Sequence, residues 1–177
     1  MLFNSLDFAL FLPLVFAAYW LLRSLALRNA VLLVASYVFY GWWDPRFLLL
    51  LAATSLIDYY VGIQLGREER QGVRRAWLGL SIGANLGMLA FFKYFNFFLE
   101  NVEHAFSFFG HPLHATHLDL VLPVGISFYT FQTMSYTIDV YRRRLAPSQG
   151  IVPFLTYVSF FPQLVAGPIE RASNLLP

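Results

Sequence analysis

The sequence of 177 residues has no cysteine and few charged residues. The lack of cysteine excludes disulfide bonds, thiolate nucleophiles and cysteine metal sites. Charged residues make up 12% of the chain and hydrophobic residues 58%, whereas an ordinary soluble domain is about 25% charged. The formal net charge of +2 is too small to indicate a nucleic-acid partner. With a mean hydropathy of +0.58, this composition predicts a polytopic protein whose main partner is a lipid bilayer.

Lysine and arginine are also missing ahead of the first apolar segment, and no small-x-small cleavage site follows Ala17-Ala18. A cleaved signal peptide is therefore not expected. Six apolar segments can be marked, and a spanning helix needs about 20 residues. The second segment is short, so it could form a short span or one arm of a re-entrant hairpin; we favour the short span. The fold class predicted is all-α, a bundle of about six transmembrane helices, with segments at 8–22, 30–43, 47–65, 76–98, 120–141 and 151–169.

Basic residues alternate between the connections. Nine of the twelve follow the first, third and fifth segments, whereas Arg46, Lys93 and Arg171 belong to the other side. Because cytoplasmic loops carry the excess of lysine and arginine, this pattern predicts six crossings with the N-terminus outside. In the sequence Gly41-Trp-Trp-Asp-Pro45, the tryptophans and the proline predict an interfacial turn that ends the second segment.

The fifth segment is crowded with polar residues. At 100° per residue, Gln132 and Asp139 share one face with Ser135 and Tyr136, while three threonines (Thr130, Thr133 and Thr137) form a second stripe. Polar groups at membrane depth are costly unless they are paired or hydrated, so the stripes should face protein or a wet cavity. Asp139 could pair with the Arg142–Arg144 cluster instead of lining such a cavity.

Two further polar positions lie within apolar segments. Asp58 is the most deeply placed carboxylate, and it could either bind a coupling ion or tie helices together by hydrogen bonds or an ion pair. In the sixth segment, Pro162, Gly167 and Pro168 predict a broken helix, which is tolerated only against protein or a water-filled cavity. Gln163 is the amide expected to face that cavity.

Small residues and histidines give weaker signals. Gly79, Gly83 and Gly87 repeat every four residues, a spacing that lets another helix approach closely. All four histidines (His104, His111, His114 and His117) lie in the connection 100–119. The last three could offer an outer metal site, but Pro112 disturbs a helix there and no carboxylate motif completes the set. A solvated loop with an amphipathic stretch at 102–109 is the preferred interpretation.

Five blocks together resemble the membrane-bound O-acyltransferase (MBOAT) family, in particular its alginate O-acetyltransferase branch. They are Tyr37-Val-Phe-Tyr-Gly-Trp-Trp, Phe92-Lys-Tyr-Phe-Asn96, Leu122-Pro-Val-Gly-Ile-Ser-Phe-Tyr-Thr-Phe-Gln132, Tyr136-Thr-Ile-Asp-Val-Tyr-Arg142 and Phe161-Pro-Gln-Leu-Val-Ala-Gly-Pro-Ile169. The resemblance implies a ring of helices around a tunnel that passes acetyl groups from cytoplasmic acetyl-CoA to an exported polysaccharide, alginate-like, or to a periplasmic acyl-transfer partner. It also implies a bacterial inner-membrane location.

The family's essential histidine sits in a Trp-His-Gly-type segment that this sequence lacks, so none of its four histidines is assigned a catalytic role. We therefore expect residues 1–177 to be the N-terminal portion of one MBOAT domain, inactive alone, with the catalytic histidine beyond Pro177. Gln132, Asp139 and Gln163 would line the tunnel, and neither a metal nor a bound cofactor is expected. The alternative is a transporter-like or flippase-like membrane protein with Asp58 as the ion-coupling group.

Overall fold

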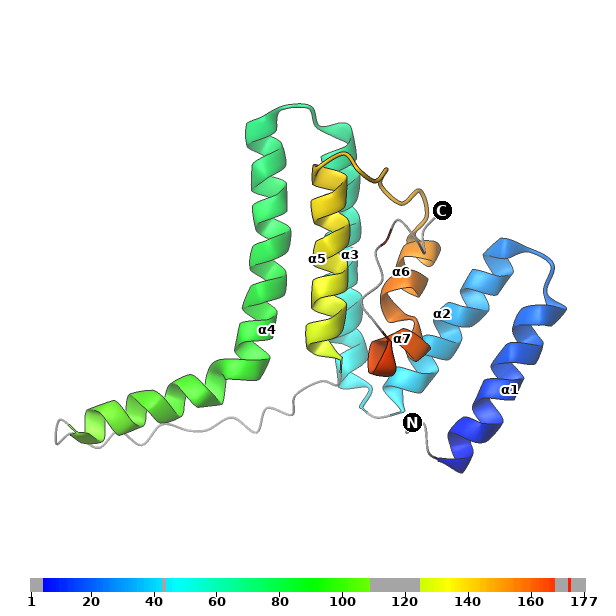
Figure 1. The fold of residues 1–177 in the computed structure, drawn as a ribbon, viewed down its shortest axis with the longest axis horizontal. Helices are drawn as coiled ribbons and strands as arrows, with labels where there is room; N and C mark the ends of the chain where they lie inside the picture. Colours follow the sequence, from blue (N-terminus) through cyan, green and yellow to red (C-terminus); the bar gives the residue numbers. More distant parts are fainter. Residues whose placement is uncertain (1–4, 43, 109–124, 168–171, 173–177) are drawn as a thin grey trace.

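The computed structural model describes residues 5–42, 44–108, 125–167 and 172, and within them every regular element is a helix (Figure 1). The all-α prediction is confirmed for this part of the chain. The helices are α1 (Leu6–Leu21), α2 (Leu25–Gly41), α3 (Arg46–Arg67), α4 (Gln71–Phe108), α5 (Ile126–Tyr141), α6 (Ile151–Ser159) and α7 (Phe161–Ala166).

Two of these helices are long and apolar enough to cross a bilayer: α3, and α4 over Gln71–Phe95. The apolar helices α1, α2 and the stretch Ile151–Leu164 are shorter. At 1.5 Å per residue, the 17 residues of α2 span about 25 Å, a little less than the roughly 30 Å of a hydrocarbon core. Six crossings therefore remain a prediction, whereas the apolar helices themselves are where the sequence places them.

Helix α4, at Gln71–Phe108, extends beyond its predicted bounds of 76–98 at both ends, and the fifth helix is shorter than predicted. Helix α5 begins at Ile126 and not at Leu120, because Gly125 has a φ of +77° and ends any continuous helix there. A Cβ on Gly125 would also lie only 3.0 Å from the Leu164 carbonyl oxygen, so this position joins a left-handed turn to close packing against α7. Residues 120–124 lie outside the described part of the chain.

Helices α3, α4 and α5 pack against one another, and α6 connects them to α2, which in turn carries α1 (Figure 1). The interior of this assembly is apolar and aromatic; its fully buried large side chains include Leu51, Tyr129, Tyr136 and Phe154. The rings of Tyr136 and Phe154 pack in a tilted arrangement with centroids 4.7 Å apart, which helps to hold α5 against α6. By contrast, α1 buries none of its residues.

The connections that were predicted to share one side of the membrane lie at one end of the assembly. Figure 1 shows residues 22–24, 68–70 and 142–150 at the same end, opposite the turn between α2 and α3. At that turn the Asp44 carboxylate accepts a hydrogen bond from the Arg46 amide at 2.9 Å. The second helix thus ends at Gly41, within the predicted Gly41–Pro45 turn, and the Asp44 carboxylate caps the first amide of α3; Trp43 lies outside the described residues.

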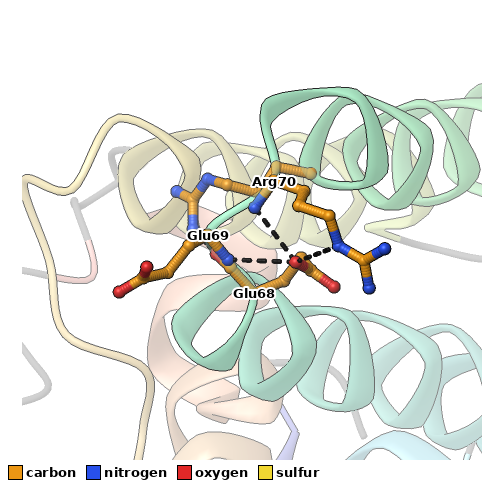
Figure 2. A network of polar contacts seen from close by, with 4 residues as sticks. Glu68, Glu69 and Arg70 are labelled. Atoms are coloured by element: carbon orange, nitrogen blue, oxygen red, sulfur yellow. Dashed lines mark hydrogen bonds and ion pairs between the residues drawn. The ribbon is translucent and has the colours of Figure 1, made fainter.

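The connection between α3 and α4 is ordered by one carboxylate. Figure 2 shows Glu68 Oε1 accepting hydrogen bonds from the amides of Glu69 (3.1 Å) and Arg70 (3.0 Å) and from the Arg70 Nε (3.3 Å). These bonds, led by that from the Arg70 amide, lower the pKa of Glu68 below its ordinary value. A carboxylate just ahead of α4 also interacts favourably with the helix dipole.

The glycine stripe of α4 does not pack as predicted. A Cβ added at Gly79, Gly83 or Gly87 would meet nothing within 4 Å among the described residues. The opposite face, with Ser81, Asn85 and Leu89, is the buried one. The close helix approach occurs instead at Gly62 of α3, where a Cβ would lie 2.5 Å from the Tyr136 hydroxyl oxygen.

Candidate functional site

A buried polar cluster joins α3, α4 and α5 around Asp58, whose side chain is 0% exposed. Its Oδ1 accepts a hydrogen bond from Ser81 Oγ at 2.6 Å, and its Oδ2 accepts one from Asn85 Nδ2 at 2.7 Å. The threonine stripe of α5 completes the cluster: Thr133 Oγ1 donates to Asn85 Oδ1 at 3.3 Å, and Thr137 Oγ1 lies 3.1 Å from Ser81 Oγ.

The hydrogen bonds of Asp58 are those expected of a carboxylate that ties helices together. Both carboxylate oxygens have a donor from α4, and no cation pairs with Asp58 within the described ranges. Such a network fixes the register of three helices, because each of its members needs its partner in place. The sequence drew attention to Asp58 and the threonines but not to Ser81 and Asn85, although their i, i+4 spacing was a signal for a buried polar face.

The second polar region follows from the predicted break in the sixth segment. Helix α6 ends at Ser159, and α7 begins at Phe161 with Pro162 in its first turn. A continuous helix would bond the Phe161 amide to the Tyr157 carbonyl. Here the Phe161 amide donates to Ser36 Oγ of α2 at 3.3 Å, and the Tyr157 carbonyl accepts from Gln132 Nε2 at 2.9 Å.

Gln132 therefore donates a hydrogen bond to a carbonyl that the helix break leaves without its usual amide partner. Its side chain is 1% exposed and bridges α5 to the last turn of α6. Its Oε1 atom and the hydroxyl of Tyr129, one turn earlier on α5, are buried and have no hydrogen-bond partner among the residues that the structure describes. Since buried polar atoms are nearly always paired, these two mark a place where a further polar group is expected.

The other two predicted tunnel residues lie at separate places. Gln163 is buried on α7, beside the break. Asp139 is half-buried near the end of α5, seven residues or about 10 Å along the helix from Gln132. Within the described residues it forms no ion pair with Arg142–Arg144, all of which are exposed. The structure thus brings Gln132 and Gln163 to the same broken helix and leaves Asp139 apart.

Arg74 is a buried cation with several hydrogen bonds that the sequence alone did not indicate. Its guanidinium, 2% exposed, donates to the carbonyls of Leu65 and Glu68 at the end of α3, and to those of Val140 (3.4 Å) and Tyr141 (2.7 Å) at the end of α5. It also lies over the Tyr141 ring, 5.5 Å from the centroid. One cation thereby satisfies terminal carbonyls of two helices.

The metal-site hypothesis concerns the histidines of the connection 100–119. His111, His114 and His117 lie outside the described part of the chain, as does the side chain of His104. Among the residues that were described, no group of three histidines or carboxylates could hold a metal ion.

Comparison with known proteins identifies relatives along the whole chain. It is 41% identical to the "Probable alginate O-acetylase AlgI" of Pseudomonas aeruginosa and to that of Azotobacter vinelandii, over 99% of this chain in each case. It is 34% identical to the "Peptidoglycan O-acetyltransferase" of Helicobacter pylori over 100% of this chain. The chain spans 34–38% of the length of these relatives. No family model and no solved structure matches.

Helical architecture and relatives together define the class: the chain is a homologue of bacterial O-acetyltransferases. The resemblance to the alginate O-acetyltransferase branch of the MBOAT family, first indicated by the five sequence blocks, is confirmed.

Proposed function

We propose that this chain is the N-terminal part of a membrane O-acetyltransferase that acetylates an exported polysaccharide. The observation that carries the proposal is the 41% identity to alginate O-acetylases along 99% of the chain. The relative named peptidoglycan O-acetyltransferase supports the same class of acceptor, since alginate and peptidoglycan are both glycans outside the cytoplasm. Acetyl-CoA on the cytoplasmic side would supply the acetyl group.

In this proposal the chain supplies the wall of an acyl-transfer tunnel. Support comes from Gln132 Oε1 and the Tyr129 hydroxyl, which are buried on α5 without a hydrogen-bond partner among the described residues. The helix break that contains Gln163 gives further support, because irregular backbone at membrane depth is tolerated only against protein or water. Asp139, half-buried near the arginine-bearing end, would lie at the tunnel's cytoplasmic mouth.

The chemistry itself would need a group that the described residues do not provide. Transfer of acetyl from a thioester to a sugar hydroxyl is favoured by a base that removes the hydroxyl proton, and histidine is the usual one. We place this histidine beyond Pro177. The acceptor would be reached from the outer side, directly or through a periplasmic acyl-transfer partner, with the protein in the bacterial inner membrane and its N-terminus outside.

A chimera tests the activity. The segment of the P. aeruginosa alginate O-acetylase that aligns with this chain would be replaced by residues 1–177, and alginate acetylation would be measured in cells that lack the native protein. We expect acetylation to be restored. A chimera that reaches the membrane in normal amount but leaves alginate unacetylated would contradict the proposal.

Within an active chimera, Gln132→Met tests the tunnel wall. Methionine fills a similar volume but removes the amide, so acetyl transfer should fall while the protein level stays the same. Ser135→Ala is the matched control, because the Ser135 hydroxyl only returns to the Gln132 carbonyl of its own helix at 2.8 Å. Equal transfer by both variants would exclude a role of the Gln132 amide in the tunnel.

Asp58→Asn separates the enzyme from the transporter-like alternative. Ion-coupled transport by Asp58 requires a carboxylate that exchanges its ion, so the variant should lose ion-dependent uptake. A structural Asp58 affects stability instead, as its bonds to Ser81 and Asn85 indicate. Uptake by proteoliposomes that disappears with Asp58→Asn would favour the transporter.

A further inference from the structure

Helix α4 is too long to be only a membrane span. Its 38 residues extend over about 57 Å at 1.5 Å per residue, whereas a bilayer's hydrocarbon core is about 30 Å thick. The stretch Gln71–Phe95 is by itself long and apolar enough to cross a bilayer, and near its end Lys93 and Tyr94 are exposed, with the Lys93 Nζ 5.5 Å from the centroid of the Tyr94 ring. Such amphipathic side chains are typical of the membrane interface.

Beyond this point the helix changes direction. Figure 1 shows α4 bending and its last part, which we call the arm (residues 97–108), running away from the other helices. The arm leaves the assembly at the end opposite the arginine-bearing connections (Figure 1). With α4 as a membrane span, the arm would begin near the bilayer surface and run sideways from the span.

One face of the arm is apolar and uncovered. Phe98, Val102 and Phe106, at i, i+4 and i+8, are 62%, 45% and 46% exposed. At 100° per residue they fall, together with Phe91 and Phe95 of the spanning part, within an arc of about 80°. The aromatic stripe of the span, in which Phe91 is 44% exposed and Phe95 half-buried, thus continues on the same side of the arm.

Polar residues lie away from the apolar arc, and one further aromatic side chain, that of Phe97, is 56% exposed at about 100° from Phe98. Glu100, Glu103 and Ser107 all project outside the apolar arc at the same angular spacing. No lysine or arginine occurs between Tyr94 and Phe108, so attraction to anionic headgroups does not contribute on the arm itself. Any affinity for a membrane must come from burial of the aromatic side chains.

We propose that the arm is an in-plane membrane helix, which lies in the headgroup layer with Phe98, Val102 and Phe106 inserted toward the acyl chains. The occupant of its apolar face is lipid and not protein, because the face continues a lipid-facing stripe at the depth where the bilayer ends. The inference rests on the proposed membrane location but not on acetyl transfer.

The absence of cysteine makes the test direct. Single cysteines at Phe98, Val102 and Phe106, and at Glu100, Glu103 and Ser107, would be labelled with the environment-sensitive dye NBD in the full chain. After reconstitution in phosphatidylcholine liposomes, the first three labels should emit at shorter wavelength and be quenched by doxyl-labelled phosphatidylcholine. The other three should emit as in water and escape that quencher.

Two controls calibrate the result. Leu49→Cys reports lipid contact, since Leu49 is 76% exposed on the spanning helix α3, and Glu69→Cys reports water. If Leu49 is quenched while all six arm positions report water, the arm is solvated and the inference is wrong. Blue-shifted arm labels that escape the lipid quencher would show a protein partner and also overturn it. Absence of quenching at Leu49 would instead contradict the membrane location itself.

Discussion

Arg74 shows how one side chain can replace two helix caps. Helices α3 and α5 both end near it, and the last carbonyls of each have no partner within their own helix. The guanidinium is planar and has five donors, so it can serve carbonyls from two directions, which an ammonium cannot do as well. Its adjacent arginine, Arg75, is exposed and has no such role.

Arg74→Met should therefore destabilise the protein by about 1–3 kcal/mol, because buried carbonyls at the ends of α3 and α5 lose their donors. Arg74→Lys should lie between methionine and the wild type, since it keeps the charge but not the fork. Thermal unfolding in detergent, followed by intrinsic fluorescence, measures the difference. Arg75→Met is the control and should change stability by no more than about 0.5 kcal/mol. Equal effects at the two positions would contradict the clamp.

A second substitution of a single residue, Asp58→Asn, tests the buried polar cluster that joins α3, α4 and α5. The carboxylate accepts from donors on both oxygens, Ser81 Oγ and Asn85 Nδ2. An amide in its place would turn one acceptor into a donor that faces another donor, which should cost about 1–3 kcal/mol. The same unfolding assay applies, with Ser135→Ala as the reference. An unchanged melting temperature would mean that the cluster does not hold the three helices together.

At the scale of helices, the effect of a glycine-to-alanine substitution on stability depends on whether the glycine lies on a covered or an open face. Gly62→Ala should destabilise the protein by about 1–3 kcal/mol, because the new Cβ would overlap the Tyr136 hydroxyl of α5. Gly83→Ala, on the open face of α4, should leave stability unchanged or raise it by up to about 1 kcal/mol through helix propensity. Melting temperatures of the two variants should move in opposite directions; a loss at Gly83 equal to that at Gly62 would show that its face is covered.

The sequence was a good guide to where helices occur, a weaker guide to the ends of α4 and α5, and a poor guide to which faces meet. Apolar segments, the Asp44-Pro45 turn and the break near Pro162 all follow from local chemistry and are present in the structure. The glycine stripe was assigned to packing because, in a membrane helix, lipid-facing and protein-facing surfaces are equally apolar. Only the third dimension shows that Ser81 and Asn85 face the neighbouring helices and that the glycines do not.

The candidate site was predicted to a similar extent. Gln132 and Gln163 were expected at a cavity wall, and both are buried at the α6–α7 break. The exchange of partners at this break, in which Ser36 takes the Phe161 amide and Gln132 the Tyr157 carbonyl, joins residues more than twenty positions apart. No local pattern contains such pairs. Arg74 escaped notice for the same reason, since its two helix ends are brought together only by folding.

Across the whole molecule, the arrangement of connections makes a prediction about sidedness. Three connections lie at one end (Figure 1); together with the helix ends that flank them they carry nine of the twelve basic residues, and cytoplasmic loops carry such an excess. Single cysteines at Ser24, Glu69 and Arg143, all exposed, should react with a membrane-impermeant maleimide only after cells are permeabilised. Trp42→Cys, at the opposite turn and 60% exposed in the wild type, should react in intact cells. Labelling of Glu69 and Trp42 from the same side would contradict the alternating scheme.

The position of Arg74 also has a consequence for the order in which the chain is assembled during synthesis. Two of its acceptors, the carbonyls of Leu65 and Glu68, are fewer than ten residues upstream, so this half of the clamp can close as soon as the α3–α4 hairpin has emerged. Its other acceptors, 66 and 67 residues downstream, are synthesised later. The α3–α4 hairpin would thus enter the membrane with Arg74 already bound to the carbonyls at the end of α3. Helix α5 would later supply the other two acceptors and so fix its own position against the hairpin.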